Sequence, residues 1–300
     1  MPAKKKESAD SVASATRVTA GATATAPRLA VRKTYKLFIG GAFPRSESGR
    51  TYVVADSKGQ FVANAAQASR KDARDAVLAA RAAFGKWSGA TAYNKGQVIY
   101  RIAEMLEGRR DEFTSLEVPA SEVDEAIDRL VWYAGWTDKL AQVVGGANPV
   151  AGPYFNISSP EPSGVVAVVA PSQPTLLGLV SVIAPAMATG NTVIVITDAP
   201  RVAITLAEVL ATSDVPGGVV NILTGSAAEV APWLASHSDV NGLDLTGVAD
   251  AKLALELEQA AAETLKRVRR PAAVDWSADP GLAPMTAYLE TKTVWHPKGM

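Results

Sequence analysis

The sequence of 300 residues contains no cysteine. This absence excludes disulfide bonds and thiolate metal sites, and it leaves the chain without a cysteine nucleophile. A chain without cysteine is typical of a reducing compartment, and we therefore expect a cytoplasmic protein.

The sequence also has few histidines, no net charge and no long apolar run. The two histidines, His237 and His296, are far apart in the sequence and do not suggest a metal cluster. Thirty basic residues balance thirty acidic ones, so we expect no nucleic-acid partner. The longest apolar run, 176–187, contains Pro185 and is too short for a bilayer, so we expect no membrane partner.

The first 33 residues, 1–33, are rich in alanine, threonine and serine and poor in large apolar side chains. They lack the compact apolar segment of a secretory signal. This composition predicts a disordered arm, which is either a solvated tail or a docking arm.

Residues 34–141 carry the patterns of short strands and amphipathic helices. Apolar and polar residues alternate in 36–43 and in 51–56, which predicts a strand pair. Ser69 followed by Asp72 is typical of a capping box at the start of a helix. Apolar residues at helical spacing predict three packing helices, with their stripes in 73–84, 98–106 and 123–134.

The segment 142–162 is rich in turn residues and short β-prone pieces, which predicts either a long hairpin or an extended linker. Residues 163–270 then alternate apolar runs with helical segments. Such runs are typical of strands buried on both faces of a parallel sheet. The alternation predicts right-handed βαβ units in a doubly wound α/β fold. We expect strands at 165–170, 192–197, 218–225 and 241–247, and helices at 175–189, 200–212, 226–236 and 250–266.

Ligands of such sheets bind at the carboxyl ends of the strands. The loops expected at that edge are 171–174, 197–200, 224–226 and 246–250. They contain neither a Gly-x-Gly-x-x-Gly motif nor a Walker lysine. Spacing alone therefore predicts an α/β domain without a recognised phosphate cradle.

Several segments, in order, resemble the aldehyde dehydrogenase superfamily. The likeness runs from Tyr35 to Val268 and returns at 285–296. It rests on the stretches YKLFIGGAF, SRKDARDAVLAARAAFGKW, VIYRIAEMLEGRRDEF, GGANPVAGPYFNISSPEPSGVVAVVAP, LVSVIAPAMATGNTVIV and LATSDVPGGVVNILTG. The resemblance implies a Rossmann-like NAD(P)-binding domain, N-terminal helices and, at 142–162, a β hairpin used for oligomerisation.

The family's chemistry needs a thiolate nucleophile, a hydride acceptor and a general base. The nucleophile is absent, and the glutamate that serves as the base falls at Pro271. The lysine that holds the cofactor ribose falls at Ile196. A glycine that lets a helix start approach the pyrophosphate falls at Lys252, whose charge offers a different phosphate contact. The resemblance thus predicts no catalytic residue and no metal ligand in this chain.

After Arg270 the likeness to the catalytic domain is missing. We expect 271–284 to be a linker in its place and 285–300 to be the family's C-terminal strand, which pairs with the hairpin. The chain would then keep both halves of the assembly element without the active-site lobe.

The resemblance leaves six candidate cofactor contacts: Gln173, Thr197, Asp198, Gly225, Thr246 and Gly247. Asp198 either accepts a ribose hydroxyl or caps the helix that begins near Pro200. Gly225 either leaves space for an adenine or is a turn glycine. Thr246 and Gly247 are either cofactor contacts or an inherited loop. We expect that no cofactor is required and that any NAD(P) binding is weak.

Two further groups of residues have alternative interpretations. The basic run 266–270 is either a phosphate site or a solvated strand end. The aromatic residues Trp132, Tyr133 and Trp136 either anchor a subunit contact or pack within the chain's own core.

Together these features favour a non-catalytic, aldehyde-dehydrogenase-like subunit. It would join an active enzyme of the family, or another copy of itself, through 142–162 and 285–296. The alternatives are an NAD(P)- or nucleotide-binding regulator and an oxidoreductase that acts on aldehydes by itself.

Overall fold

The computed structural model describes residue 29 and residues 31–299. The arm predicted for 1–33 therefore lies almost entirely outside the described residues. The chain divides into residues 1–32 and a unit that begins at Lys33, and every element below belongs to the second unit.

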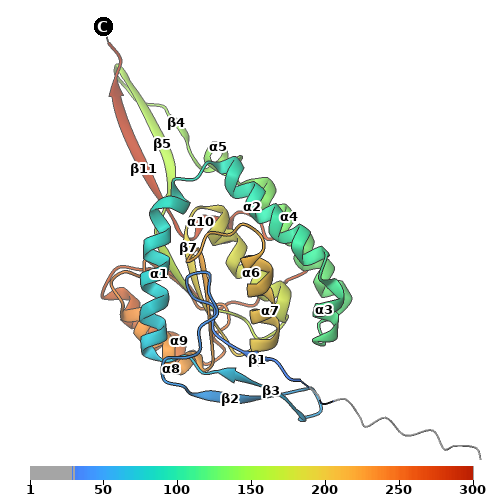
Figure 1. Ribbon diagram of the computed structural model, residues 1–300. Helices are drawn as coiled ribbons and strands as arrows, with labels where there is room; N and C mark the ends of the chain where they lie inside the picture. The colour runs from blue at the N-terminus through green and yellow to red at the C-terminus, as the bar shows by residue number, and fades with distance from the viewer. Residues whose placement is uncertain (1–28, 30, 300) are drawn as a thin grey trace, which may run out of the picture. The chain divides into compact units, whose positions relative to one another are not determined.

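A five-stranded sheet forms the centre of this unit (Figure 1). Its strand order is β10-β9-β6-β7-β8, and all neighbours run parallel. The chain starts in the middle at β6, adds β7 and β8 on one side, and then returns to add β9 and β10 on the other. The strands are β6 (Val165–Val169), β7 (Thr192–Thr197), β8 (Val220–Thr224), β9 (Gly242–Asp244) and β10 (Arg267–Arg269). The predicted doubly wound α/β fold is confirmed.

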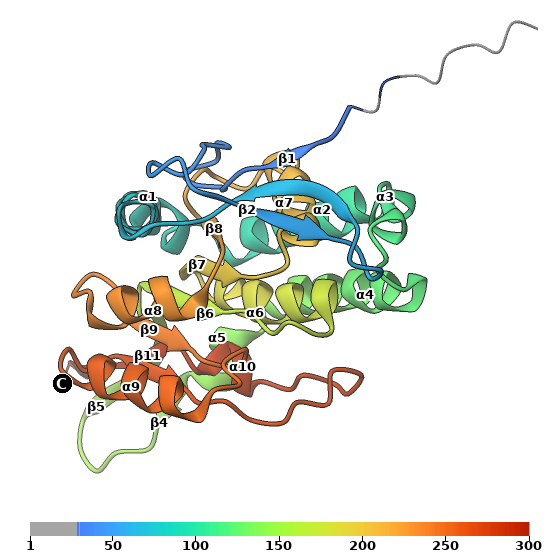
Figure 2. The ribbon, with the colours of Figure 1, turned by 90° about the horizontal axis from the view of Figure 1, so that it is seen from below.

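Alternate residues of these strands enter two separate apolar cores. Val166 and Val168 of β6 lie in the core beneath α6 (Thr175–Ala188) and α7 (Pro200–Ala211). Val165 and Val169 lie in the core shared with α1 (Arg70–Ser88), α8 (Ala227–Ser236) and α9 (Ala251–Ala262). Because both faces are covered, the strands are apolar throughout, as their sequences predicted. Helices α8 (Ala227–Ser236) and α9 (Ala251–Ala262) lie side by side in both views (Figure 1, Figure 2).

The three predicted N-terminal helices form at α1 (Arg70–Ser88), α2 (Ala92–Glu107) and α4 (Ala120–Trp136). Helix α2 packs against α4, and both pack against α6. Ile99, Leu130 and Tyr133 are buried at these contacts. Short helices complete the set: α3 (Arg110–Ser115), α5 (Leu140–Val144) and α10 (Ala283–Thr286).

The predicted pairing of 36–43 with 51–56 is wrong. Strand β2 (Thr51–Ala55) instead pairs with β3 (Phe61–Ala66), and β3 also pairs with β1 (Thr34–Tyr35). Segment 36–43 turns back on itself, since Gly40 and Gly41 have φ of +63° and +83° and Ile39 bridges Ala42.

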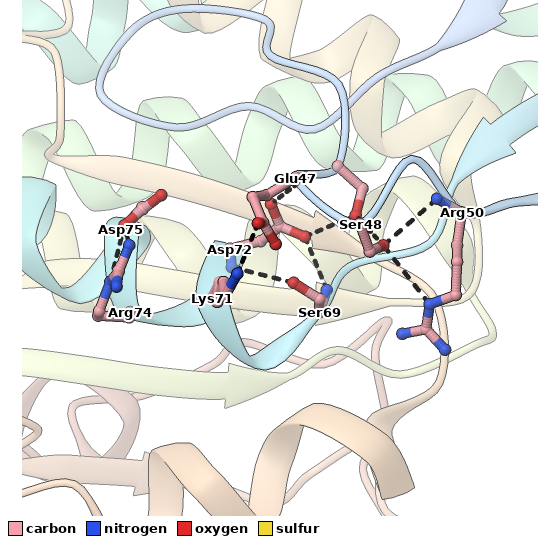
Figure 3. A network of polar contacts seen from close by, with 9 residues as sticks. Glu47, Ser48, Arg50, Ser69, Lys71, Asp72, Arg74 and Asp75 are labelled. Carbon is pink, nitrogen blue, oxygen red and sulfur yellow. Dashed lines mark hydrogen bonds and ion pairs between the residues drawn. The ribbon is translucent and has the colours of Figure 1, made fainter.

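The capping box predicted at Ser69 is confirmed, and Asp72 also holds a distant loop (Figure 3). Its buried carboxylate accepts hydrogen bonds from the Ser69 N–H at 2.7 Å, the Ser46 hydroxyl at 2.7 Å and the Glu47 N–H at 2.9 Å. One side chain thus caps α1 and fixes the chain before β2.

The hairpin predicted at 142–162 forms as β4 (Gly146–Asn148) and β5 (Tyr154–Pro162). The C-terminal strand β11 (Leu289–Pro297) pairs antiparallel with β5 over its whole length, from Leu289 opposite Pro162 to Pro297 opposite Tyr154. The strand order of this sheet is β11-β5-β4. Residues 146–162 and 289–297 are called the hairpin sheet below.

The segment between β10 and α10 crosses the molecule without regular structure. Arg129 of α4 holds it by donating to the Trp276 carbonyl at 2.6 Å and the Ala278 carbonyl at 3.2 Å. Among residues 31–299, no helix has the length and apolarity needed to cross a membrane.

Candidate functional site

A cavity of about 370 Å³ lies at the carboxyl ends of the strands, where the sequence predicted a ligand edge. It is lined by residues that follow β6, β7, β8 and β9, including the first turns of α8 and α9. Apolar side chains form much of its wall: Val169, Ile196, Val248 and Leu253. Figure 2 shows the strands that lead to this edge together with α8 and α9.

Thr197 and Asp198, two of the six candidate cofactor contacts, line the cavity. The Thr197 hydroxyl accepts a hydrogen bond from the Ala199 N–H at 3.1 Å. The Asp198 carboxylate accepts one from the Ser172 hydroxyl at 3.1 Å. Asp198 does not cap α7, since the cap residue is Ala199 and no side chain bonds to the N-terminal N–H groups of that helix. The alternative of Asp198 as a helix cap is therefore wrong.

Gly225 and Gly247 line the same cavity for different backbone reasons. Gly225 has φ of +131°, which side-chain-bearing residues rarely adopt. Gly247 lies so close to β6 that an added Cβ would be 2.1 Å from the Ala170 carbonyl oxygen. Gly247 therefore lets the loop after β9 approach the end of β6.

Gln173 and Thr246 do not line this cavity. Gln173 is exposed and donates from its amide to the Thr175 hydroxyl at 3.1 Å. Thr246 bonds to the buried Asp244 carboxylate through its N–H at 2.9 Å and its hydroxyl at 2.5 Å. Thr246 lines a neighbouring, more open hollow of about 480 Å³ that also contains Pro271. The structure thus brings together four of the six candidate contacts.

Carboxylates occupy helix starts at this edge. Asp250 caps α9, and its side chain accepts the Lys252 N–H at 2.8 Å. Glu122 of α4 is buried at the start of α6, where it accepts the Leu176 N–H at 2.6 Å and the Leu177 N–H at 3.2 Å. These N–H groups carry the partial positive charge of the helix end, which here faces protein carboxylates.

Lys252 is not among the residues that line the cavity. Its side chain is 86% exposed and lies 3.9 Å from Glu256 one turn further along α9. The phosphate contact suggested for Lys252 by its position in the sequence stays a prediction.

Tyr52 of β2 lies on the outer side of the same edge. Burial, together with the negative charge of Asp198, raises the pKa of the Tyr52 hydroxyl to about 12. Because an ordinary phenol is already neutral at physiological pH, the raised pKa affects the protonation of Tyr52 only in alkaline solution.

The three arginines of the basic run 266–270 form ion pairs with neighbouring carboxylates. Arg267 binds Glu290 at 2.6 Å, Arg269 binds Asp244 at 3.2 Å and Arg270 binds Glu258 at 2.9 Å. These contacts join β10 to β11, β9 and α9, and they support a structural role for the run.

The aromatic residues near the hairpin pack largely within the chain. Tyr133 is buried, while Trp132 and Trp136 are half-buried and contact it or each other, with ring centroids 5.0 Å and 5.5 Å apart. His237 stacks edge-on against Trp233, and His296 lies exposed on β11. Within the described part of the chain, no group of three or more potential ligands is placed to hold a metal ion.

The sequence interpretation missed Ser172, Glu122 and Asp250 at this edge. Asp250 precedes a helical pattern and is a preferred N-cap residue, so its role was accessible from sequence. Glu122 reaches α6 across 54 residues, and no local pattern signals that contact.

The fold and this edge can now be compared with known proteins. The profile described as "Aldehyde dehydrogenase family" matches residues 43–270 of the chain. The chain belongs to the aldehyde dehydrogenase family.

The matched region covers half or less of each relative named here. The putative aldehyde dehydrogenase DhaS of Bacillus subtilis is 31% identical over 250 residues, which cover 78% of this chain and 50% of the relative. The mitochondrial aldehyde dehydrogenase family 2 member B4 of Arabidopsis thaliana is 34% identical over 230 residues, with coverages of 72% and 42%. The chain therefore spans about half the length of these relatives.

Solved structures agree with this relationship. HpcC from Thermus thermophilus superposes with a TM-score of 0.74 at 29% identity, covering 79% of this chain and 47% of that chain. The NAD+ complex of an aldehyde dehydrogenase from Bacillus cereus gives 0.71 at 26% identity, with coverages of 79% and 50%.

Proposed function

We propose that this aldehyde dehydrogenase family protein is a non-catalytic structural subunit. It assembles through the hairpin sheet with an active aldehyde dehydrogenase or with a second copy of itself, in the cytoplasm. The observation that carries the proposal is the exposed apolar surface of that sheet.

Five large apolar side chains are exposed on the hairpin sheet: Tyr154, Phe155, Ile157, Val294 and Trp295. Phe155 and Ile157 alternate along β5, and Val294 lies directly opposite Ile157, so these three share one face. Their exposed fractions are 58%, 47% and 37%. A contiguous apolar group of this kind is typical of a surface that another chain covers.

The edges of the hairpin sheet also favour assembly. In the order β11-β5-β4, no strand among residues 31–299 pairs with the outer edge of β11 or of β4. Strand β11 is nine residues long, and its outward N–H and C=O groups can pair with a strand of a partner.

The composition supports a role without chemistry for this chain. It has no cysteine, and Pro271 stands where the resemblance places the general base. A thiolate nucleophile is what the aldehyde chemistry of the family needs, so aldehyde oxidation would require that group from another chain.

Sedimentation analysis of Ile157→Lys tests the proposal, because a buried lysine at an apolar interface is costly. We expect the parent chain to sediment as an assembly and Ile157→Lys to sediment as a monomer. Leu78→Lys is the matched control, since Leu78 of α1 is 60% exposed and lies outside the hairpin sheet. A parent chain that stays monomeric alone and with a family enzyme contradicts the proposal.

The second candidate is a ligand-binding regulator, and the cavity at the strand ends favours it. In that case a small molecule would occupy the cavity without being turned over. Calorimetry detects such binding, and an assay for aldehyde oxidation by the purified chain separates it from residual dehydrogenase activity.

A further inference from the structure

Only acidic groups carry charge among the described side chains that line the cavity at the strand ends. Asp198 and Asp250 contribute carboxylates, and the lining formed by these residues contains no lysine, arginine or histidine. A pyrophosphate is held by cations or by free N–H groups at a helix start. The charge of this lining is therefore opposite to what a dinucleotide needs.

Some of the N–H groups at three neighbouring helix starts already have side-chain partners, and one position has no N–H. Asp250 accepts the Lys252 N–H in α9. Glu122 accepts two N–H groups in the first turn of α6. Helix α7 begins with Pro200, which has no N–H, and the preceding N–H of Ala199 bonds to Thr197.

Helix α8 starts at the same edge without a side-chain cap, but its first turn is acidic. Glu229 in that turn forms an ion pair with Arg50 and also accepts a hydrogen bond from the Gln67 amide at 2.8 Å. These contacts leave Arg50 engaged with protein and not available to a phosphate. The side chains present do not fit the pyrophosphate of NAD(P).

We propose that this cavity selects an uncharged or cationic heteroaromatic ligand and rejects phosphorylated forms of it. The apolar walls formed by Val169, Ile196 and Val248 can cover a flat ring, and the two carboxylates accept hydrogen bonds from hydroxyl or amino groups. This selection is independent of assembly through the hairpin sheet.

Calorimetry with adenosine, AMP and NAD tests the proposal, because the three share a base and ribose and differ in phosphate. We expect adenosine to bind at least roughly tenfold more tightly than AMP, and NAD to give no heat at millimolar concentration. Added salt should narrow the gap by screening the carboxylates. Tighter binding of AMP or NAD than of adenosine overturns the proposal, as does the absence of heat with all three.

The variant Asp250→Asn tests the charge itself. Asparagine is also a good N-cap, so α9 keeps its start while the carboxylate charge is removed. We expect AMP to bind roughly threefold to tenfold more tightly and adenosine to be little changed. Asp111→Asn, on the exposed start of α3, is the control and should change neither affinity. An unchanged ratio of the two affinities in Asp250→Asn contradicts the electrostatic selection.

Discussion

Single carboxylates hold much of this chain in place, and Asp72 shows how. It is 3% exposed and accepts hydrogen bonds from α1 and from a loop about 25 residues away in the sequence. Bonds to a buried charged group are stronger than neutral ones, and removing the carboxylate leaves its donors without a partner. Asp72 therefore links the capping of α1 to the position of the strands before it.

We expect Asp72→Ala to lower the free energy of unfolding by about 2–4 kcal/mol, because Ser46, Glu47 and Ser69 lose their acceptor. Chemical denaturation measures this change. Asp75→Ala on the same helix is the control, since the Asp75 side chain is 45% exposed and pairs with the adjacent, exposed Arg74, and its cost should stay within about 0.5 kcal/mol. Equal effects of the two substitutions would show that the buried network is unimportant.

Tyr52 is a single residue that makes the stability of the folded chain depend on pH. The folded-state pKa of its hydroxyl is about 12 and the ordinary value is 10.0, so the folded protein keeps this proton more firmly than the unfolded chain does. The resulting stabilisation is complete below about pH 10 and is lost as the pH rises towards 12.

Thermal melts of Tyr52→Phe between pH 8 and 12 should accordingly show a smaller decline than those of the parent chain. The decline should not vanish, because burial also raises the pKa of Tyr133 and of Tyr288. Parallel melting curves for the parent chain and Tyr52→Phe would exclude this contribution.

At the scale of elements, the close approach of the β9 loop to β6 shapes the cavity. Gly247 allows it, because a Cβ there would lie 2.1 Å from the Ala170 carbonyl oxygen and 2.6 Å from that of Val169. A side chain at 247 must push the loop away from the sheet.

Gly247→Ala should therefore destabilise the fold by about 1–3 kcal/mol through forced displacement. Gly85→Ala is a control of opposite sign: Gly85 lies in α1 with no atom within 4 Å of an added Cβ, and alanine there should stabilise by up to about 1 kcal/mol. The melting temperatures of the two variants measure these opposite changes in stability. A neutral Gly247→Ala would mean that the loop moves without cost.

The elements that the sequence predicted correctly share one feature: their apolar residues follow a single regular spacing over the whole element. The buried strands β6 and β7 and the helices α1, α2 and α4 each have such a spacing, and all form where expected. Strand β3 was missed because its sequence, FVANAA, contains alanine and asparagine, which are poor strand formers. Strand β10 has no apolar pattern to indicate it, because it has three residues, two of them arginine, and only the family resemblance suggested a strand there.

At the scale of the whole molecule, the sequence order of the strands predicted which loops meet at one edge, and four of the six candidate contacts do line one cavity. Gln173 and Thr246 instead form local hydrogen bonds outside this cavity. The sequence pattern does not indicate those bonds. Glu122 bonds to the start of α6, and Arg129 bonds to the segment 276–278. Both contacts depend on tertiary packing, so the sequence alone did not predict them.

The hairpin sheet carries the surface that we propose for assembly. Strand β11 pairs with β5 from more than 100 residues further along the chain, so the complete sheet joins two distant segments. A side-chain network continues the pairing, since the Ser158 and Thr293 hydroxyls lie 2.9 Å apart. The apolar residues on this sheet are thus presented by a well-paired scaffold.

The most direct test of the proposed role is the intact mass of the complex that this chain forms when it is isolated from its native host under non-denaturing conditions. The proposal predicts a species containing at least one further chain, either a family enzyme or a second copy. A single species of 31.3 kDa, the mass of one chain, would contradict it.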